Sequence, residues 1–378
     1  MCVNVSIVEC ADYEAERVKA ALKAVLEPLG GLDWVEPGMK VAVKANLVAR
    51  MKPESAAATH PVLVTELCRM LTERGAEVTV GDSPGGPFTA AWVNGIYTGT
   101  GMRMVEQAGA KLNSDYSTCE MSFPEGNTIK SFPYTSWLKE ADAVIDFAKL
   151  KTHGMAGMTC AVKNFFGVIP GTKKPEFHYM HPNTSDFCDM LCDLAAYVKP
   201  RLTLVDAVLC MEGNGPTQGK PRHMGALLAA DTPFNADLVC AGLIGMKPAD
   251  APTVAAAIKR GLCPESAAEL NISGDPGKFA LPDFEKLPIS QDITFHRGFP
   301  LINAFIRRNF GTGPKVDRSK CVGCGKCHEV CPTGAAAVKK GKAQIDSRKC
   351  IRCFCCQEFC PKGAVTVHRP LLARIVTR

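Results

Sequence analysis

Short apolar runs alternate with segments of helical periodicity through the first two thirds of the chain. Six runs rich in Val, Ile, Leu and Ala predict strands, and several of them are apolar on both faces. They span residues 3–8, 40–45, 77–82, 142–150, 202–209 and 225–230. Between them, apolar residues recur at helical spacing over 12–29, 61–74, 185–198 and 234–244. This alternation predicts an α/β domain over residues 1–298, a mainly parallel sheet with helices on both faces.

Polar side chains follow several of the predicted strands directly. Ligands of such sheets bind beyond the carboxyl ends of the strands, so we expect these groups to converge on one cleft. The candidate substrate-binding residues are Lys44, Asn46, Asp82, Ser83, Lys149, Asn164, Glu212 and Asn214.

The segment "KLKTHGMAGMTCAVKNFFGVIPG", residues 149–171, carries the most chemically active side chains. Lys149, Lys151 and His153 alternate at the end of a strand and therefore point to one side. Lysine and amide groups together suit the carboxylate or phosphate of an anionic small molecule. A lysine or histidine there can also donate a proton, so Lys151, His153 and Lys163 are the candidate catalytic residues. The alternative is that the lysines are solvated.

The glycine-rich stretch "GNGPTQGK" does not match a phosphate-binding P-loop. Only three residues separate Gly215 from Gly219, and Pro221 stands where a Ser or Thr is needed. The glycines either make turns or offer amide groups to a ligand. No nicotinamide or flavin fingerprint occurs, which leaves a flavin open without indicating it.

An additional metal ion is a second open question. His178 and His181 could form a site with Asp82, Glu212 or His153, but no ligand spacing requires one.

Near the C-terminus, the pattern C-x2-C-x2-C-x3-C-P occurs twice and predicts two [4Fe–4S] clusters. In such repeats the fourth cysteine reaches the other cluster. The expected ligand sets are Cys321, Cys324, Cys327 and Cys360 for one cluster, and Cys350, Cys353, Cys356 and Cys331 for the other.

A pair of zinc knuckles is the alternative for these cysteines, but zinc usually has a longer gap between its two pairs. Cys355 breaks the repeat and lies between two expected ligands. It is either a spare thiol or a hydrogen-bonding group that tunes the cluster potential. The other cysteines are scattered, and buried free cysteine mostly packs as a small hydrophobe.

Charge is distributed unevenly along the chain. Residues 315–378 contain 14 Lys and Arg against 4 Asp and Glu, whereas residues 1–314 contain 30 against 34. A basic redox module would attract an acidic electron donor such as ferredoxin or flavodoxin. Nucleic acid is set aside as a partner, because no binding motif or aromatic platform accompanies the charge. A merely solvated basic surface is the remaining alternative.

The chain shows no signal peptide and no apolar run of membrane-spanning length, which favours a cytoplasmic protein without a membrane partner. Residues 299–315 predict an amphipathic helix with a Gly/Pro stop. The expected organisation is therefore an α/β domain (1–298), a linker helix (299–316), a small α+β ferredoxin-like two-cluster domain (317–368) and a basic tail (369–378).

Several motifs together resemble the domain-of-unknown-function 362 family, whose members often carry a bacterial-type ferredoxin. They are "VKANLV", "VGDSPGG", "KLKTH", "VKNFFGVIPG", "VDAVLCMEGNGPTQGKPR", "FNADLV" and "KCIRCFCCQEFCP". The likeness covers roughly residues 3–365 and implies an architecture and iron–sulfur clusters rather than a reaction. It places Lys151, His153, Lys163, Asn164, Glu212, Asn214 and Asp237 in the motif segments. Cys160, just before "AVKN", is unusual there and is either a ligand or a packing residue.

Three functions agree with these features. The first is a ferredoxin-dependent reductase in which two clusters pass electrons to an anionic substrate, or a bound cofactor, in the α/β cleft. The second is a non-catalytic electron-transfer or assembly protein, which would form tight complexes without turnover. The third is a non-redox acid–base enzyme with structural or sensory clusters, whose activity would survive mutation of Cys324. The fusion of a cluster pair to a cleft favours the reductase.

Overall fold

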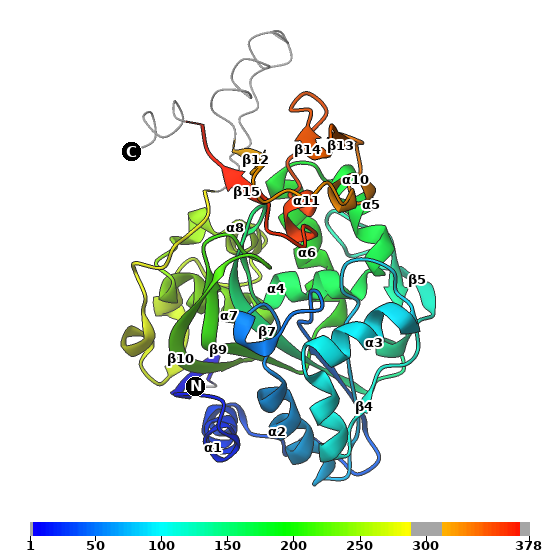
Figure 1. Cartoon of the computed structure of the whole chain (residues 1–378). Coiled ribbons are helices and arrows are strands. Elements are labelled where there is room, and N and C mark those ends of the chain that lie inside the picture. The colour runs from blue at the N-terminus through cyan, green and yellow to red at the C-terminus, as the bar shows by residue number, and fades with distance from the viewer. Residues whose placement is uncertain (1–2, 289–311, 371–378) are drawn as a thin grey trace.

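The computed structural model describes residues 3–288 and 312–370, which form an α/β domain with a small cysteine-rich module on one end of its sheet (Figure 1). Within these residues the main sheet has nine strands, in the order β11-β1-β10-β9-β7-β2-β3-β4 with β8 paired to β7. Its strands are β1 Val5–Glu9, β2 Lys40–Ala45, β3 Glu77–Gly81, β4 Lys111–Leu112, β7 Ala143–His153, β8 Gly157–Thr159, β9 Leu202–Glu212, β10 Lys220–Ala230 and β11 Ile272–Ser273.

The α/β fold predicted from the apolar pattern is confirmed, and the sheet is mixed in direction. Strands β9, β7, β2, β3 and β4 run parallel, whereas β10 is antiparallel to both β9 and β1. The short connection 213–219 between β9 and β10 explains the reversal, because a parallel crossover needs a dozen or more residues. A separate hairpin is formed by β5 Thr118–Ser122 and β6 Ser131–Thr135.

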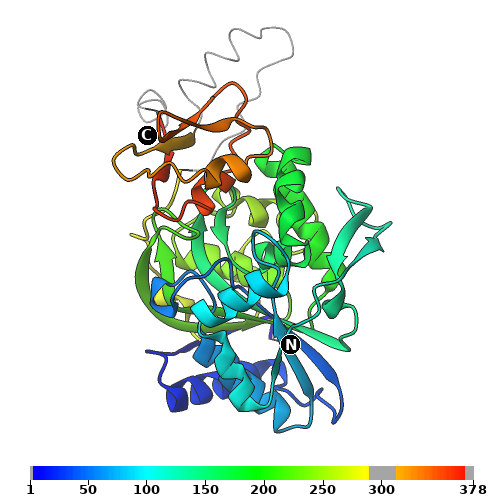
Figure 2. The same cartoon turned by 45° about the vertical axis from the view of Figure 1, so that its right-hand side comes forward.

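The helices cover both faces of the sheet (Figures 1 and 2). Helices α1 and α2 pack together, and α4, α6, α7 and α8 form a second packed group. Pro61 and Pro233 each occupy a first helical turn, where the missing proline N–H costs nothing. The helices are α1 Ala15–Leu26, α2 Pro61–Thr72, α3 Ala90–Gly99, α4 Ala161–Asn164, α5 Lys174–Met180, α6 Thr184–Val198, α7 Pro233–Leu243 and α8 Pro252–Lys259.

The cysteine-rich module consists of two short strand pairs and two short helices. Strand β12 (Gly313–Val316) pairs with β15 (Val365–His368), and β13 (Ala336–Lys339) pairs with β14 (Lys342–Ile345). Its helices are α10 Lys326–Glu329 and α11 Cys355–Glu358.

The predicted linker helix falls mostly on residues 289–311, outside the described residues, and its last four positions form strand β12. Most of the basic tail, residues 371–378, also lies outside them. Among the described helices, none is both long and apolar enough to cross a bilayer.

Candidate functional site

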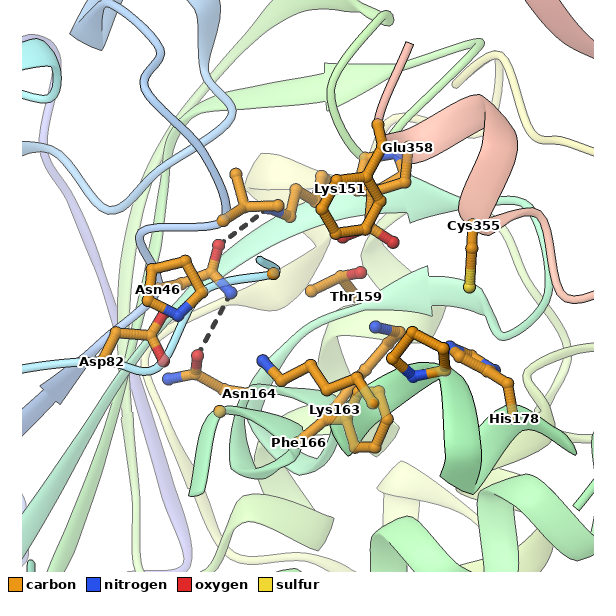
Figure 3. A pocket seen from close by; sticks show the side chains of 18 residues that line it. Asn46, Asp82, Lys151, Thr159, Lys163, Asn164, Phe166, His178, Cys355 and Glu358 are labelled. Carbon is orange, nitrogen blue, oxygen red and sulfur yellow. Dashed lines mark hydrogen bonds between the residues drawn. The ribbon is translucent and has the colours of Figure 1, made fainter. Parts of the chain in front are cut away.

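A cleft lies between the carboxyl ends of the parallel strands and the cysteine-rich module (Figure 3). Its cavity volume is about 50 Å³, within an empty space of about 600 Å³ that includes the open mouth. From the module, helix α11 and the residue after it contribute Cys355, Glu358 and Phe359. From the α/β domain the principal lining residues are Asn46, Asp82, Gly85, Lys151, Thr159, Lys163, Asn164, Phe166, Lys174, His178 and Pro216.

A buried polar network forms the floor of the cleft. The Lys44 ammonium pairs with Asp82 at 2.7 Å and donates a hydrogen bond to the Asn164 side-chain oxygen at 3.0 Å. The Asn164 amide donates in turn to Asp146 at 2.7 Å, and burial raises the pKa of Asp146 well above its usual range. Asn46 also donates to Asn164, at 3.1 Å. Lys44 therefore supports the floor rather than lining the cleft.

Lys151 reaches the cleft from the end of β7. Its Nζ donates to the Asn46 side-chain oxygen at 2.7 Å and to the Ala57 carbonyl. Burial lowers the pKa of Lys151 to about 7, and the negative charge of Glu358 opposes that shift. A lysine that titrates near neutrality can both donate and accept a proton.

His153 lies beside the module, not among the residues that line the cleft. Its Nδ1 accepts hydrogen bonds from the amides of Met155 and Ala156, both at 3.1 Å. Burial, and next the charge of Lys163, hold the pKa of His153 well below its usual range. The ring is thus neutral, and its Nε2 lies 4.0 Å from a Glu358 carboxylate oxygen.

Two lysines flank one aromatic ring in the wall of the cleft. The Nζ atoms of Lys163 and Lys174 lie 5.7 Å and 5.3 Å from the centre of the Phe166 ring. Burial lowers the pKa of Lys163, and it lowers the pKa of Lys174 to about 8. Lys174 also donates to the Ser83 carbonyl, which is how Ser83 contributes to this wall.

Sequence reasoning did not identify Lys174 as a site residue. It follows Lys173 in a "TKKPEF" segment, and nothing in that local sequence separates the two lysines. The side chain of Lys173 is 55% exposed and pairs with Glu176, whereas that of Lys174 turns into the cleft.

His178 and Thr159 bring polar atoms into the cleft without a partner. His178 is buried and stacks on Phe187, with ring centres 4.4 Å apart. Its Nδ1 and the Thr159 hydroxyl make no hydrogen bond to any described residue. Burial lowers the pKa of His178 to about 3.

The proposed metal site around the histidines is not supported by the geometry. Within the described part of the chain, His153, His178 and His181 are not gathered with one another or with Asp82 or Glu212 as ligands of a single ion.

Besides Lys44, three further predicted substrate-binding residues lie away from the cleft. Lys149 forms a buried ion pair with Asp206 at 2.7 Å. Glu212 accepts a hydrogen bond from the Glu285 amide at 3.1 Å, and Asn214 donates to the Val365 carbonyl of the module at 3.3 Å.

The glycine-rich loop after β9 docks the module. Gln357 of α11 donates to the carbonyls of Asn214 and Gly215, both at 2.9 Å. Thr217 donates to the Glu358 carbonyl at 3.0 Å, and Gln218 donates to the Cys360 carbonyl at 3.2 Å. The loop therefore contributes hydrogen bonds to the domain interface rather than a phosphate cradle.

The module approaches the α/β domain so closely that glycine is needed at two positions of the domain. A Cβ on Gly85 would lie 2.1 Å from the Phe359 ring, and one on Gly154 would lie 3.0 Å from Phe354. Phe354 itself has a φ of 62°, a strained value for a bulky residue. Its ring is only 2% exposed and packs into the α/β core, which offsets that strain.

The cysteines form two groups, which we call the outer and the inner quartet. The outer quartet, Cys321, Cys324, Cys327 and Cys360, lines a single cavity in the module. Burial, and then the charges of Cys321, Cys324 and Cys360, raise the pKa of Cys327. The amides of Ala343 and Ala364 donate to Cys321 Sγ at 3.3 Å and to Cys360 Sγ at 3.2 Å.

The inner quartet consists of Cys331, Cys350, Cys353 and Cys356. Burial, and then the charges of Cys353 and Cys331, raise the pKa of Cys350 to about 11. The Arg352 amide donates to Cys350 Sγ at 3.4 Å. Cys360 thus lies near the first three thiols of the other repeat, and Cys331 lies near Cys350 and Cys356, while the ligation of two clusters by these groups stays a prediction. Amide donors of this kind stabilise thiolates.

The positions of two further cysteines bear on the roles that the sequence left open. Cys355 lines the cleft and hydrogen-bonds with Cys353 of the inner quartet. Cys160 is buried beside Cys240 and Asp237, away from the cleft lining, and packs as a core residue. Asp237 accepts hydrogen bonds from the Ala161 and Val162 amides and so fixes the start of α4.

Comparisons with known proteins match the α/β domain and the cysteine-rich module separately. The model of a domain of unknown function, DUF362, matches residues 41–242, and that of a 4Fe-4S dicluster domain matches residues 313–361. A thylakoid-associated protein, sll1697, of Synechocystis sp. is 34% identical over 295 residues, which cover 76% of this chain and 88% of that protein.

Solved structures show a weaker likeness. The lactate racemase apoprotein of Thermoanaerobacterium thermosaccharolyticum aligns with a TM-score of 0.38 and 13% identity over 61% of this chain. A Thermotoga maritima protein aligns with a TM-score of 0.36 and 16% identity over 57% of it. The chain spans only about half of each structure, 54% and 55% respectively, and scores this low carry no functional argument.

Proposed function

This chain belongs to the DUF362 family and carries a 4Fe-4S dicluster domain, and we propose that it is an iron–sulfur oxidoreductase that reduces an anionic small molecule. The single observation that carries the proposal is the composition of the cleft wall. Cys355 and Glu358, from helix α11, which also carries Cys356 of the inner quartet, face Lys163 and His178 across the cleft (Figure 3). A ligand bound there would lie beside a redox centre.

Two [4Fe–4S] clusters, held by the outer and inner quartets, would supply the one-electron carriers. A two-electron reduction then consumes two electrons and two protons, and two molecules of a reduced one-electron donor are each oxidised by one electron. Lys163 and Lys174 attract the anion. Lys151 supplies one proton from the floor of the cleft, and the second enters from solvent at the cleft mouth. Phe359 and Pro216 narrow the site and limit access of water.

The surface around the outer quartet suits an acidic electron donor, a ferredoxin or flavodoxin. The outer quartet includes the exposed Cys324, and the exposed lysines Lys320, Lys326 and Lys362 surround it. Such a surface attracts an acidic protein and raises its rate of association. Thiolate ligands require a reducing compartment, for which we propose the cytoplasm.

Anaerobic purification followed by chemical reduction tests the proposal. Iron and sulfide analysis should give two [4Fe–4S] clusters, and mass spectrometry should identify any small molecule that copurifies. The reduced protein should then be reoxidised by one class of small anion in a panel of carboxylates, oxyanions and phosphate esters. Reduced clusters that no anion discharges, together with a tightly bound partner protein, would instead favour the electron-transfer or assembly function. Turnover of a substrate without any electron donor, undiminished in Cys324→Ser, would favour the acid–base enzyme.

A further inference from the structure

The charges around the cleft do not balance among the described residues. Lys151, Lys163 and Lys174 face it, and Glu358 is the only carboxylate lining it that is not already in an ion pair with a lysine. Lys163 makes no hydrogen bond and no ion pair with any described residue. Its Nζ lies over the Phe166 ring, and Glu358 is the carboxylate whose charge acts on it most strongly. Lys151, whose pKa is about 7, is only partly charged at neutral pH, and Lys163 and Lys174 together still carry more positive charge than Glu358 offsets. Partly desolvated charge of this kind is costly unless it is paired.

The lysines and the polar groups without a partner lie around one aromatic ring. Lys163 and Lys174 lie on the same Phe166 ring, and the His178 ring packs edge-on against it with centres 5.4 Å apart. The charges of Lys163 and Lys174 both act on His178, whose Nδ1 has no partner among the described residues. The Thr159 hydroxyl, also without a partner there, lines the same space.

The volume of the cleft limits the size of the anionic group that a ligand can place there. A cavity of about 50 Å³ holds a few water molecules, or one compact tetrahedral oxyanion, but not a nucleotide or a flavin. The open mouth, which brings the empty space to about 600 Å³, can receive the remainder of a small molecule.

We infer that Lys163, Lys174, His178 and Thr159 bind a compact dianionic oxyanion, the phosphate group of a small phosphate monoester. The inference rests on the proposed function, because it names the substrate class for the same cleft. Lys163 and Lys174 offer two cationic groups to a dianion, and a tetrahedral group can accept hydrogen bonds from donors that surround it on several sides. The remainder of the monoester then extends toward Cys355 and Glu358.

Binding to the oxidised holoprotein tests the site without electron transfer. Isothermal titration at low ionic strength should show sulfate and inorganic phosphate binding about tenfold or more tightly than nitrate, a monoanion of similar size. Glycerol 3-phosphate should bind at least as tightly as free phosphate. Succinate that binds more tightly than sulfate would overturn the compact site, as would equal affinities for sulfate and nitrate or exclusion of the monoester.

Substitutions locate the anion. Lys163→Met and Lys174→Met should each weaken sulfate binding about tenfold, whereas Lys173→Met, on the exposed neighbour, should leave it unchanged. Lys163→Arg, which keeps the charge, should restore most of the affinity. Lys163→Met should also raise the melting temperature of the sulfate-free protein, because it removes an unpaired and partly desolvated charge. Sulfate affinity that is unchanged in both methionine variants would overturn the inference. Failure of reduction in the panel above, with these affinities as expected, would overturn only the proposed redox function.

Discussion

The two cysteine repeats have the same spacing, yet their surroundings differ. Residues 321–331 form the outer repeat, which supplies three thiols of the outer quartet, and residues 350–360 form the inner repeat, which supplies three thiols of the inner quartet. Beside the outer quartet, Val322 is 59% exposed and Cys324 is exposed. Beside the inner quartet, Phe354 is 2% exposed, and Gln357 is fully buried against the loop after β9. One repeat therefore faces solvent and the other faces the α/β domain. The difference assigns a direction in our proposal, with electrons accepted at the outer quartet and delivered at the inner one.

Removal of one ligand from each quartet should separate these two roles and give the largest effect. Cys353→Ser, in the inner quartet, should reduce oxidation of the dithionite-reduced protein by substrate to the background rate. Cys324→Ser, in the outer quartet, should slow reduction by a protein donor while discharge to substrate persists. Stopped-flow absorbance measures both steps, and iron analysis verifies that the untouched cluster remains. Equal loss of both steps in both variants would contradict the assignment.

The packing of the inner repeat on the α/β domain should contribute strongly to stability. Phe354→Ala removes a buried ring and should lower the free energy of unfolding by about 3–5 kcal/mol. Val322→Ala, at the exposed position of the outer repeat, is the matched control and should change it by less than about 0.5 kcal/mol. Anaerobic urea titration of the two holoproteins makes the comparison. Similar midpoints for the two variants would show that the interface is not formed in solution.

Anion binding should weaken as pH rises, because it requires protonated lysines. The pKa of Lys174 is about 8, and the groups that act on it are Asp82, Lys44, Glu358 and Lys163. One unit above that value its charge is lost from about nine tenths of the molecules, so sulfate affinity should be about tenfold lower at pH 9 than well below pH 8. Lys174→Arg stays charged and should retain its affinity at pH 9. Titration calorimetry across this pH range measures the sulfate affinity of the wild type and of Lys174→Arg. An equal loss of affinity with rising pH in the two proteins would contradict the assignment.

Charge reversal on the outer surface should have the smallest effect. Lys362 lines the outer cavity and is exposed. Lys362→Glu should slow association with an acidic ferredoxin about threefold at low ionic strength, and added salt should remove the difference. Lys23→Glu, on α1 of the α/β domain, serves as the control. Equal rates for the two variants would place the donor surface elsewhere.

The sequence predicted the features that depend on local patterns. Strands, helices and both cysteine repeats follow from periodicity and spacing. Of the candidate residues between 151 and 164, Lys151, Lys163 and Asn164 line the cleft, whereas His153 does not. Lys44 and Lys149 were predicted to bind substrate, but each is paired with a carboxylate from a neighbouring strand: Asp82 follows β3, and Asp206 lies within β9. Such pairing depends on which strands become neighbours, and a single sequence does not specify that.

The contribution of the module to the cleft could not be predicted for a related reason. Asn214 and the glycines after β9 carry the polar composition of a ligand-binding loop, yet their partners are backbone groups of the module. Cys355 and Glu358 enter the cleft only because α11 docks on that loop. Contacts between parts of the chain that are far apart in the sequence leave no periodic signal in either segment.

The central claim is that the inner cluster, and not the outer one, lies beside the anion site. Potentiometric titration of the holoprotein by electron paramagnetic resonance, with and without sulfate, tests this directly. A bound dianion adds negative charge near the inner cluster and should lower its midpoint potential, while the potential of the outer cluster stays constant. The Cys324→Ser protein should retain the sulfate-dependent shift, and the Cys353→Ser protein should lose it. A shift confined to the outer cluster, or sulfate binding that moves neither potential, would contradict the account.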